Sequence, residues 1–407
     1  MALVPHATRR ASFAEGLKLR ASPRHYHHYV RYPTSQGRTI RLPLTGDKII
    51  GVAVSRGNRN FQEDAHAISA IHLPWEELQY GLKRNFGISW NPGIGDLDMG
   101  TRCCMLVSMM GAHGGQVVSQ YLRDHLHDRF ETVETSLVPN VVGWLKESGG
   151  YFKRFRGGVL EEWTRDPPSR RSLDLEARAT LAFLQACIFV LYLHFPRLQR
   201  CGATASVAIL HPLELPVTPF FASEYQALTI AHCGDTRVIL CSTESGKAFP
   251  MTENHHAETR GEAARLRRMG TGLVTDSYGE ARWMGAVANT RGLGDSEFKP
   301  VGVTPEPEVR RHILKGKDWA FLAFVSDGVS SILSDDEIVD LARDSHDPHS
   351  AAQTILAFAE ELGSEDNATV IIVPLSGWGT VRGMDRTKEL RDYRKKLAVG
   401  SERQRRM

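Results

Sequence analysis

The chain has 407 residues, 42% of them hydrophobic and 24% charged, which is the composition of a globular protein with a large core. The formal net charge of +3 is small for this length, and no basic stripe alternates with aromatic residues, so nucleic acid is not expected as a partner. The six cysteines form no CxxC pair, which argues against a zinc ribbon and a disulfide framework.

The first 45 residues differ in composition from the rest of the chain. They contain eight Lys or Arg residues and a single acid, Glu15. An Arg-rich, acid-poor N-terminus is typical of a mitochondrial transit segment, and the alternative is a basic tail on a cytoplasmic protein. We therefore predict a basic extension over residues 1–45 that directs mitochondrial import.

The next segments predict strands, a helix and two insertions. Two apolar stretches around the turn RGNRN predict a pair of strands joined as a hairpin within residues 48–70. Residues 75–101, rich in Gly, Pro and Trp, and residues 134–172 are expected to be inserted loops. Between them, apolar positions at helical spacing predict a helix that begins just past Gly115.

The second half of the chain alternates less regularly between strands and helices. The apolar run 179–195 contains Gln185 and His194 and is too short to cross a membrane, so it predicts a buried helix, starting near Leu173, and no membrane insertion. The remaining patterns predict strands at 203–210, 227–234, 236–242, 318–328 and 368–375, helices at 256–270, 335–344 and 350–363, and a charged tail with a surface helix at 376–407. This order favours an α+β protein with two antiparallel sheets flanked by helix pairs.

Several acidic residues stand beside Gly or Asn where apolar strands end. They are Glu63, Asp64, Asp235, Asp295, Asp327 and Asp366. A single Asp-Gly or Asp-Asn pair is more often an ordinary turn. Their recurrence is what is needed to gather oxygen ligands around Mg²⁺ or Mn²⁺, so the sequence predicts a metal-dependent hydrolase.

The motifs that carry these acids resemble a known family. In chain order, RNFQEDAH, HGG, CGATASVAIL, IAHCGDTRVIL, NTRGLGDSEFK, FVSDGV and GSEDNATVIIV resemble the PPM family of metal-dependent protein serine/threonine phosphatases, also called type 2C. The resemblance spans about residues 48–375. It implies a four-layer α-β-β-α sandwich, a centre of two Mn²⁺ or Mg²⁺ ions and a phosphoprotein substrate. We also expect a monomer.

The same resemblance assigns roles to particular residues. It implies that Arg59 binds the phosphate and that His113 is the general acid for the leaving seryl or threonyl oxygen. The implied metal ligands are Glu63, Asp64, the carbonyl of Ala112, Asp327 and Asp366, with Asp235 near a third and weaker metal position. Without the resemblance, Arg59 is an arginine in a solvated turn and His113 a histidine at a helix start.

The implied reaction is direct hydrolysis. Two metal ions lower the pKa of a bridging water, which attacks phosphorus in line without a phosphoenzyme. The third site is not expected here, because Ser331 stands where the family has its second acid for that metal. The basic N-terminus and the tail WGTVRGMDRTKELRDYRKKL are similar to the fungal mitochondrial branch of the family.

The sequence departs from the family pattern ahead of HGG. The family has an aspartate that bridges both metals and then a glycine, whereas this chain has Gly111 and Ala112. Alanine still offers a carbonyl, but glycine cannot replace a carboxylate shared by two cations. The sequence as written therefore predicts weak metal binding and severely reduced activity.

Two explanations of Gly111 follow. The chain is either a pseudophosphatase that binds phosphoproteins as a scaffold, or its reading frame is misassigned locally. Met109-Met110-Gly111 requires the codons ATG ATG GGN, and a frame moved back by one base gives NAT GAT GGG, which encodes Asp-Gly. A compensating shift before His113 would be required. A small-molecule phosphatase of the same fold differs only in substrate, which the sequence does not address.

Overall fold

Two five-stranded antiparallel sheets form the centre of the protein. The computed structural model describes residues 28–33, 38–92, 103–148, 173–191, 200–267, 272–275 and 281–398. The first sheet has the order β15 (Glu308–Lys315), β9 (Tyr225–Cys233), β8 (Ala205–Pro212), β5 (Cys103–Met110), β4 (Ala65–His72). The second has the order β11 (Ala248–Pro250), β10 (Arg237–Ser242), β16 (Trp319–Val325), β17 (Ala368–Pro374), β3 (Gly51–Ser55).

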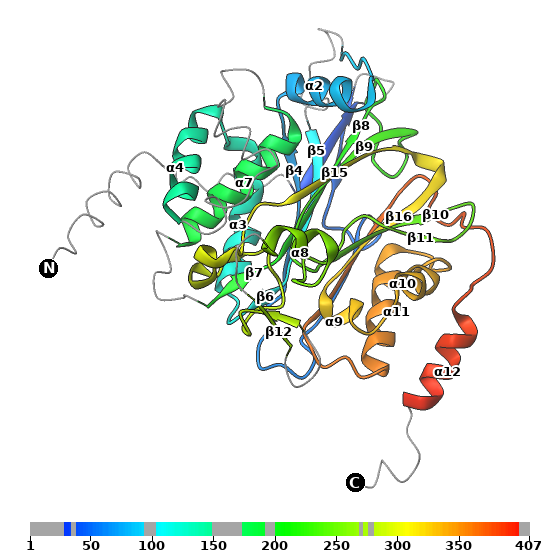
Figure 1. The fold of residues 1–407 in the computed structure, drawn as a ribbon. Coiled ribbons are helices and arrows are strands. Elements are labelled where there is room, and N and C mark those ends of the chain that lie inside the picture. The colour runs from blue at the N-terminus through cyan, green and yellow to red at the C-terminus, as the bar shows by residue number, and fades with distance from the viewer. Residues whose placement is uncertain are drawn as a thin grey trace, which may run out of the picture.

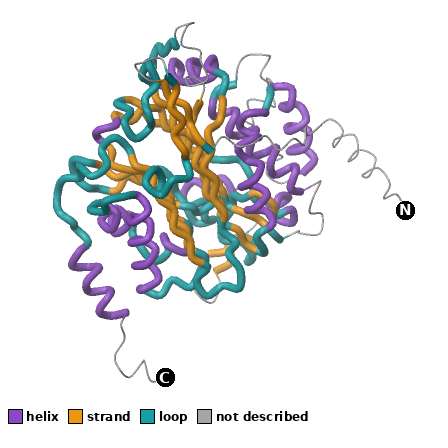
Figure 2. The backbone as a smooth tube through the Cα atoms, turned by 180° about the vertical axis from the view of Figure 1, so that it is seen from behind, coloured by secondary structure: helices purple, strands orange, loops and turns teal. Residues whose placement is uncertain are grey.

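Helices cover the outer face of each sheet (Figure 1; Figure 2). On the first sheet they are α2 (Trp75–Phe86), α3 (Val117–Thr132), α4 (Val138–Ser148) and α7 (Leu175–Phe189), and on the second they are α9 (Asp327–Ser330), α10 (Asp335–Ala342) and α11 (Pro348–Glu361). The layers are therefore helix, sheet, sheet, helix. This arrangement confirms the predicted α+β sandwich.

Strand β5 shows why its sequence, CCMLVSMM, is apolar almost throughout. Met105, Val107 and Met109 lie in the core between the two sheets, where they meet residues of the opposite sheet such as Phe324. The intervening positions, such as Leu106, face the helices of the first outer layer. A strand that is buried on both faces needs apolar residues at every position rather than at alternate ones.

Short elements complete the structure. A hairpin of β1 (Tyr29–Pro33) and β2 (Thr39–Pro43) precedes the sheets, and β6 (Ala112–His113), β7 (Gly202–Ala203) and β14 (Leu293–Gly294) form a small third sheet. The rest are α8 (Arg260–Leu266), the β12 (Leu273–Thr275) and β13 (Ala281–Trp283) pair, the 3₁₀ segments η2 (Thr135–Leu137), η5 (Ser296–Val301) and η6 (Gly316–Asp318), and α12 (Lys388–Ala398). No described helix is both long and apolar enough to span a membrane.

Several predicted elements are confirmed. Helix α3 begins at Val117, just past Gly115, and α7 is buried along almost its whole length. The predicted strands that correspond to β8, β9, β10, β16 and β17 are present, as are the helices α8, α10 and α11, with ends that differ by a few residues. The strands β11 to β15 were not predicted. The run 192–199 and the loop-rich stretch 149–172 lie outside the described residues.

The predicted hairpin within residues 48–70 is wrong. Strand β3 pairs with β17 in the second sheet, and β4 pairs with β5 in the first. The connection 56–64 crosses from one sheet to the other and is too long for a tight hairpin turn. Because it crosses at the end of the sandwich, it can carry functional side chains to the gap between the sheets.

The predicted loops at 75–101 and 134–172 are partly wrong, because both begin with helices. Helix α2 has acids in its first turn, bases in its last, and a left-handed Gly87 at its end, which are the ordinary signals of helix ends. Its Glu77 forms a buried ion pair with Arg178 of α7 at 2.6 Å, so α2 is fastened to the outer layer. Residues 93–102 lie outside the described part.

The predicted N-terminal extension is folded from residue 29 onward. The β1–β2 hairpin contributes Val30 and Tyr32 to the core between the sheets, and Leu44 just after it is fully buried. These residues therefore belong to the domain. Residues 1–27 lie outside the described residues.

Candidate functional site

A cavity of about 650 Å³ opens at one end of the sandwich. Six carboxylates line it, from loops that follow or precede strands of both sheets: Glu63, Asp64, Asp235, Asp295, Asp327 and Asp366. Arg59, Ala112 and His113 line the same cavity. The structure therefore brings together every residue for which a site role was predicted, although they span more than 300 positions of the chain.

Asp64 and Asp327 are held close to other acids in this cavity. Burial raises the pKa of Asp327 to about 8, and the charges of Asp235, Asp64 and Asp366 add to the shift. Burial likewise raises the pKa of Asp64 to about 7, against hydrogen bonds from Thr369 and Ser326. Such shifts arise where carboxylates are desolvated and lie near one another, and a bound cation would oppose both effects.

Arg59 and Asp366 form an ion pair at the mouth of the cavity. The Nη2 of Arg59 donates to Oδ2 of Asp366 at 2.7 Å, and the side chains are 60% and 40% exposed. This hydrogen bond, together with the charge of Asp366, raises the pKa of the guanidinium. The arginine is therefore charged and reachable from solvent, so its remaining donors can bind an anion.

Asn367 fixes the loop that carries Arg59, Glu63 and Asp64. Its side-chain nitrogen donates to the carbonyls of Arg56 and Phe61, and its side-chain oxygen accepts from the backbone of Glu63 at 2.8 Å. Sequence reasoning assigned a role to Asp366 but not to its neighbour. The Asp-Asn pair was the available signal, but the three contacts join residues about 300 positions apart.

His113 pairs with an acid that the sequence did not assign to it. Its Nε2 lies 2.9 Å from Oδ1 of Asp295, a buried residue at the start of η5. Asp295 has a left-handed backbone with φ of 50°, which Asp tolerates better than most residues. The fit also requires Gly202, because a Cβ there would lie 2.0 Å from the Asp295 carboxylate.

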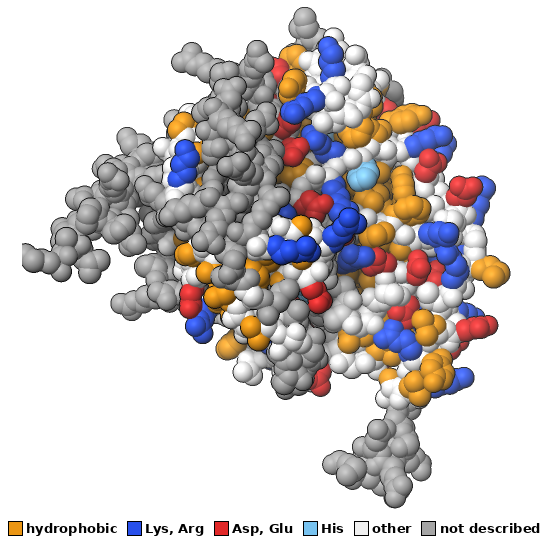
Figure 3. Space-filling view, in the orientation of Figure 1, with side chains coloured by type: hydrophobic (Ala, Val, Ile, Leu, Met, Phe, Trp, Pro, Cys, Tyr) orange, Lys and Arg blue, Asp and Glu red, His pale blue; other side chains and the backbone are white. Residues whose placement is uncertain are grey.

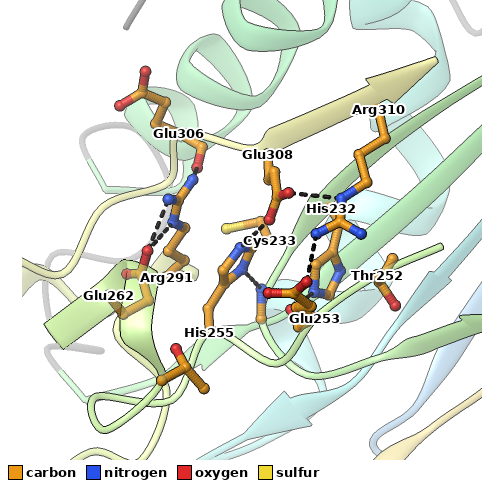
Figure 4. A network of polar contacts seen from close by, with 12 residues as sticks. His232, Cys233, Thr252, Glu253, His255, Glu262, Arg291, Glu306, Glu308 and Arg310 are labelled. Atoms are coloured by element: carbon orange, nitrogen blue, oxygen red, sulfur yellow. Dashed lines mark hydrogen bonds and ion pairs between the residues drawn. The ribbon is translucent and has the colours of Figure 1, made fainter. Parts of the chain in front are cut away.

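The Asp235 loop is supported from behind by a network of polar contacts (Figure 4). The backbone N–H of Gly234 donates to Nδ1 of His255 at 3.0 Å, and the backbone N–H of His255 donates back to Gly234 at 2.8 Å. Nε2 of His255 contacts Glu308, which also accepts from Arg310. These contacts fix the turn that places Asp235 in the cavity.

Asp235 itself is hydrogen bonded. Its Oδ2 accepts from Asn289 at 2.7 Å and lies 3.9 Å from Nε2 of His256. Burial raises the pKa of Asp235, but the hydrogen bonds from His256 and Asn289 outweigh it and lower the pKa overall. Ser331, which replaces the second acid expected for a third metal, also lines the cavity and supplies no carboxylate.

Gly111 stands where the family pattern predicts a carboxylate. A Cβ built on it would lie 3.6 Å from Oδ1 of Asp64 and 3.1 Å from Oγ1 of Thr204, so a side chain at this position would point into the cavity. Its φ is not in the left-handed region that only glycine adopts easily. The backbone could therefore accept an aspartate here with a small adjustment of Thr204.

The comparisons with known proteins agree with this geometry. A family model described as Protein phosphatase 2C matches residues 105–368. The chain is 34% identical over 291 residues to "Protein phosphatase 2C homolog 4" of Schizosaccharomyces pombe, covering 70% of this chain and 74% of that protein. The chain belongs to the protein phosphatase 2C family. The resemblance read from the sequence motifs is thereby confirmed.

Other relatives of this protein phosphatase 2C match in part. It is 36% identical over 182 residues to "Protein phosphatase 1K, mitochondrial" of Xenopus laevis, covering 45% of each chain. Among solved structures, a Caenorhabditis elegans sex determining protein matches with a TM-score of 0.54 at 20% identity, covering 88% of this chain and 69% of that one. A serine-threonine phosphatase 2C from Toxoplasma gondii has a TM-score of 0.53 at 14% identity, covering 85% and 98%. These structures share the fold.

The carboxylates of this phosphatase are of the type that binds divalent cations, but their oxygens are not arranged around a common point where a cation could bind. No three His, Cys, Asp or Glu side chains in the described ranges form a ready metal-binding group. The oxygens use protein donors instead, since Asp64 accepts from Thr369 at 2.8 Å and Asp327 from the backbone of Gly328 at 2.9 Å. Hard carboxylate donors suit Mg²⁺ and Mn²⁺, whereas position 111 adds no side-chain oxygen.

The pKa values of Asp64 and Asp327 predict the pH dependence of stability in the metal-free protein. Both lie above the value of about 4 for an unfolded aspartate, so the folded protein binds more protons than the unfolded chain between about pH 4 and pH 8. Stability therefore falls as the pH rises through this window. Asp327→Asn should raise the unfolding temperature in chelator, by a gain that grows from pH 4 to pH 8.

The matched control is Asp344→Asn, since the Asp344 side chain is 85% exposed. It should leave the unfolding temperature unchanged at every pH. Mn²⁺ should stabilise the wild-type protein more than Asp327→Asn. A lower unfolding temperature for Asp327→Asn at pH 8 in chelator would contradict the repulsion between these carboxylates.

The contact between His113 and Asp295 predicts a measurable change in the imidazole. Burial lowers the pKa of His113, but the hydrogen bond and charge of Asp295 outweigh it and raise the pKa overall. Asp295→Asn should therefore lower the pKa of His113, measured by NMR titration of its ring protons in chelator. Glu297→Gln, two residues away and paired with Arg200, should leave it unchanged. An equal shift in both variants would exclude a specific role for Asp295.

Proposed function

We propose that this protein is a metal-dependent serine/threonine phosphatase that hydrolyses phosphoserine and phosphothreonine in proteins, with Mn²⁺ or Mg²⁺ bound at the carboxylate cavity. The observation that carries the proposal is the gathering of acids in one cavity, two of them with raised pKa values, beside an exposed Arg59. Two bound cations would supply an activated water and neutralise charge on the phosphoryl oxygens. Glu63, Asp64, Asp327 and Asp366 would hold them, with the carbonyl of Ala112.

The remaining residues of the cavity position the substrate and a proton. The planar guanidinium of Arg59 can donate two hydrogen bonds to two phosphoryl oxygens. To do so it gives up part of its hydrogen bonding to Asp366. His113 donates its Nε2 proton to Asp295, which leaves Nδ1 as the atom that can hold a proton for the leaving oxygen. The buried Asp295 keeps the imidazole in one orientation.

A second candidate function is a phosphoprotein-binding scaffold, which Gly111 favours. With no side chain at that position, bound cations would receive no carboxylate from residue 111, whereas Arg59 would still be available to bind phosphate. The residues Cys104–Met110 fill the cores on both sides of β5, so the sequence as written is compatible with the fold. A local change of reading frame remains our hypothesis for Gly111, and sequencing the transcript tests it. An in-frame ATGATGGG with no insertion or deletion contradicts it.

The pair of substitutions Gly111→Asp and Ala112→Gly separates the two functions. If the rest of the site is intact, the double variant should bind Mn²⁺ more tightly by calorimetry. It should also hydrolyse a phosphothreonine peptide at least about 100-fold faster than the chain as written.

Adding Asp327→Asn to that double variant is the control, and it should abolish the gain. A double variant as inactive as the starting chain would show that the missing carboxylate is not what limits activity. Binding of the phosphopeptide by the unmodified chain, without turnover, supports the scaffold instead.

We also propose a mitochondrial location. It is supported by the basic composition of the residues before the β1–β2 hairpin. This segment contains five basic residues, Arg9, Arg10, Lys18, Arg20 and Arg24, and a single acid, Glu15. The hairpin belongs to the domain, so we confine the import signal to residues 1–28. A fluorescent protein fused after residue 28 should enter mitochondria, and replacing the four arginines by glutamine should leave it in the cytoplasm. A diffuse unmodified fusion would contradict the proposal.

A further inference from the structure

Helix α12 stands at the edge of the molecule beside α10 and α11 (Figure 1). It runs over Lys388–Ala398, the last described residues, and buries none of its side chains. It contributes nothing to the catalytic cavity, so neither the fold nor the proposed function accounts for it.

The helix is fastened to the domain by its charged side. Nη1 of Arg394 bonds both carboxylate oxygens of Glu337, at 2.7 and 2.8 Å, and its Nη2 donates to the carbonyl of Ile332 at 2.7 Å. Lys395 pairs with Glu361 at 2.8 Å. Arg391 pairs with Asp385 at 2.6 Å. These contacts come from one side of the helix and fix its rotation.

The apolar side of α12 consequently faces solvent. Leu390, Tyr393 and Leu397 are 50%, 61% and 62% exposed, and they recur at the i, i+3, i+7 spacing of one helix face. We call these three residues the Leu390 stripe. Met384, just before the helix, is 82% exposed. A helix on a globular protein ordinarily buries its apolar stripe and exposes its charges, and α12 does the reverse.

The charge around the Leu390 stripe is positive. Residues 382–396 contain seven Lys or Arg and three Asp or Glu. Arg382, Arg386, Lys388 and Lys396 form no ion pair with a described residue, and Glu389 and Asp392 are the outward acids. Figure 3 shows hydrophobic and basic side chains together at the lower right, where Figure 1 places α12.

We propose that α12 docks the protein on an anionic lipid membrane surface. Leucine side chains and the amphipathic ring of tyrosine suit the boundary between headgroups and acyl chains, and flanking lysines and arginines are attracted to anionic headgroups. The ion pairs to α10 and α11 hold the stripe outward, so no rearrangement of the domain is needed for contact. The proposal is independent of the catalytic function.

The test is flotation of the full chain with lipid vesicles. The protein should float with vesicles of phosphatidylcholine mixed with phosphatidylglycerol and not with phosphatidylcholine alone, and the bound fraction should fall at high salt. The double variant L390S/L397S should lower the vesicle affinity at least about tenfold, because two apolar side chains leave the interface.

The matched control is Y80S/F86S, two apolar residues of α2 that are 49% and 37% exposed. It should bind vesicles as the unmodified chain does. Both double variants should remain folded at the temperature of the assay, which thermal unfolding checks. Equal flotation of L390S/L397S and the unmodified chain, or no preference for anionic vesicles, overturns the proposal. A dimer that L390S/L397S converts to a monomer, without vesicle binding, assigns the stripe to a second copy and also overturns it.

Discussion

The crowding of carboxylates into one cavity, where they are partly removed from water, is the constraint on which this structure depends. Desolvation raises the pKa values of Asp64 and Asp327, and the charges of neighbouring acids in the same cavity add to both shifts. A fold that gathers such groups is less stable at neutral pH than one that leaves them in solvent. The grouping of these carboxylates is what a cation site requires, because a divalent ion would attract carboxylates that otherwise repel one another. The end of a rigid two-sheet sandwich can hold the acids in place until the ion arrives.

The sandwich does this through contacts that bridge distant parts of the chain. Asn367 ties the β3–β4 connection to the end of β17, His255 closes the turn before Asp235, and Asp295 orients His113 from across the small third sheet. Each contact uses a polar side chain whose partners are backbone groups or a single acid. Asn367 and His255 thereby fix the backbone that carries the acids without using the carboxylate oxygens themselves.

Gly111 matters because it lies at the centre of this arrangement. A Cβ at this position would lie 3.6 Å from Oδ1 of Asp64 and 3.1 Å from Oγ1 of Thr204. The acids Glu63, Asp64, Asp235, Asp327 and Asp366, together with Arg59 and His113, line the same cavity as Gly111, and Ser331 is the second position there without the carboxylate that the family pattern predicts. Helix α12 is a separate case, in which ion pairs hold an orientation that leaves the apolar side chains of the Leu390 stripe exposed to water.

The sequence by itself determined which acids, arginine and histidine would be found together in the cavity, most of the apolar strands of both sheets, and the family. Each of these can be recognised in a short segment of sequence, such as the almost entirely apolar β5 or an acid that follows a strand. It did not reveal that β3 and β4 lie in different sheets, that Asp295 partners His113, or that α12 turns its Leu390 stripe outward. Those features depend on pairings between residues far apart in the chain, whose energies come from register, burial and hydrogen bonds that form only when the whole sandwich closes. Local patterns specify which groups are present, and only the tertiary structure decides which of them meet.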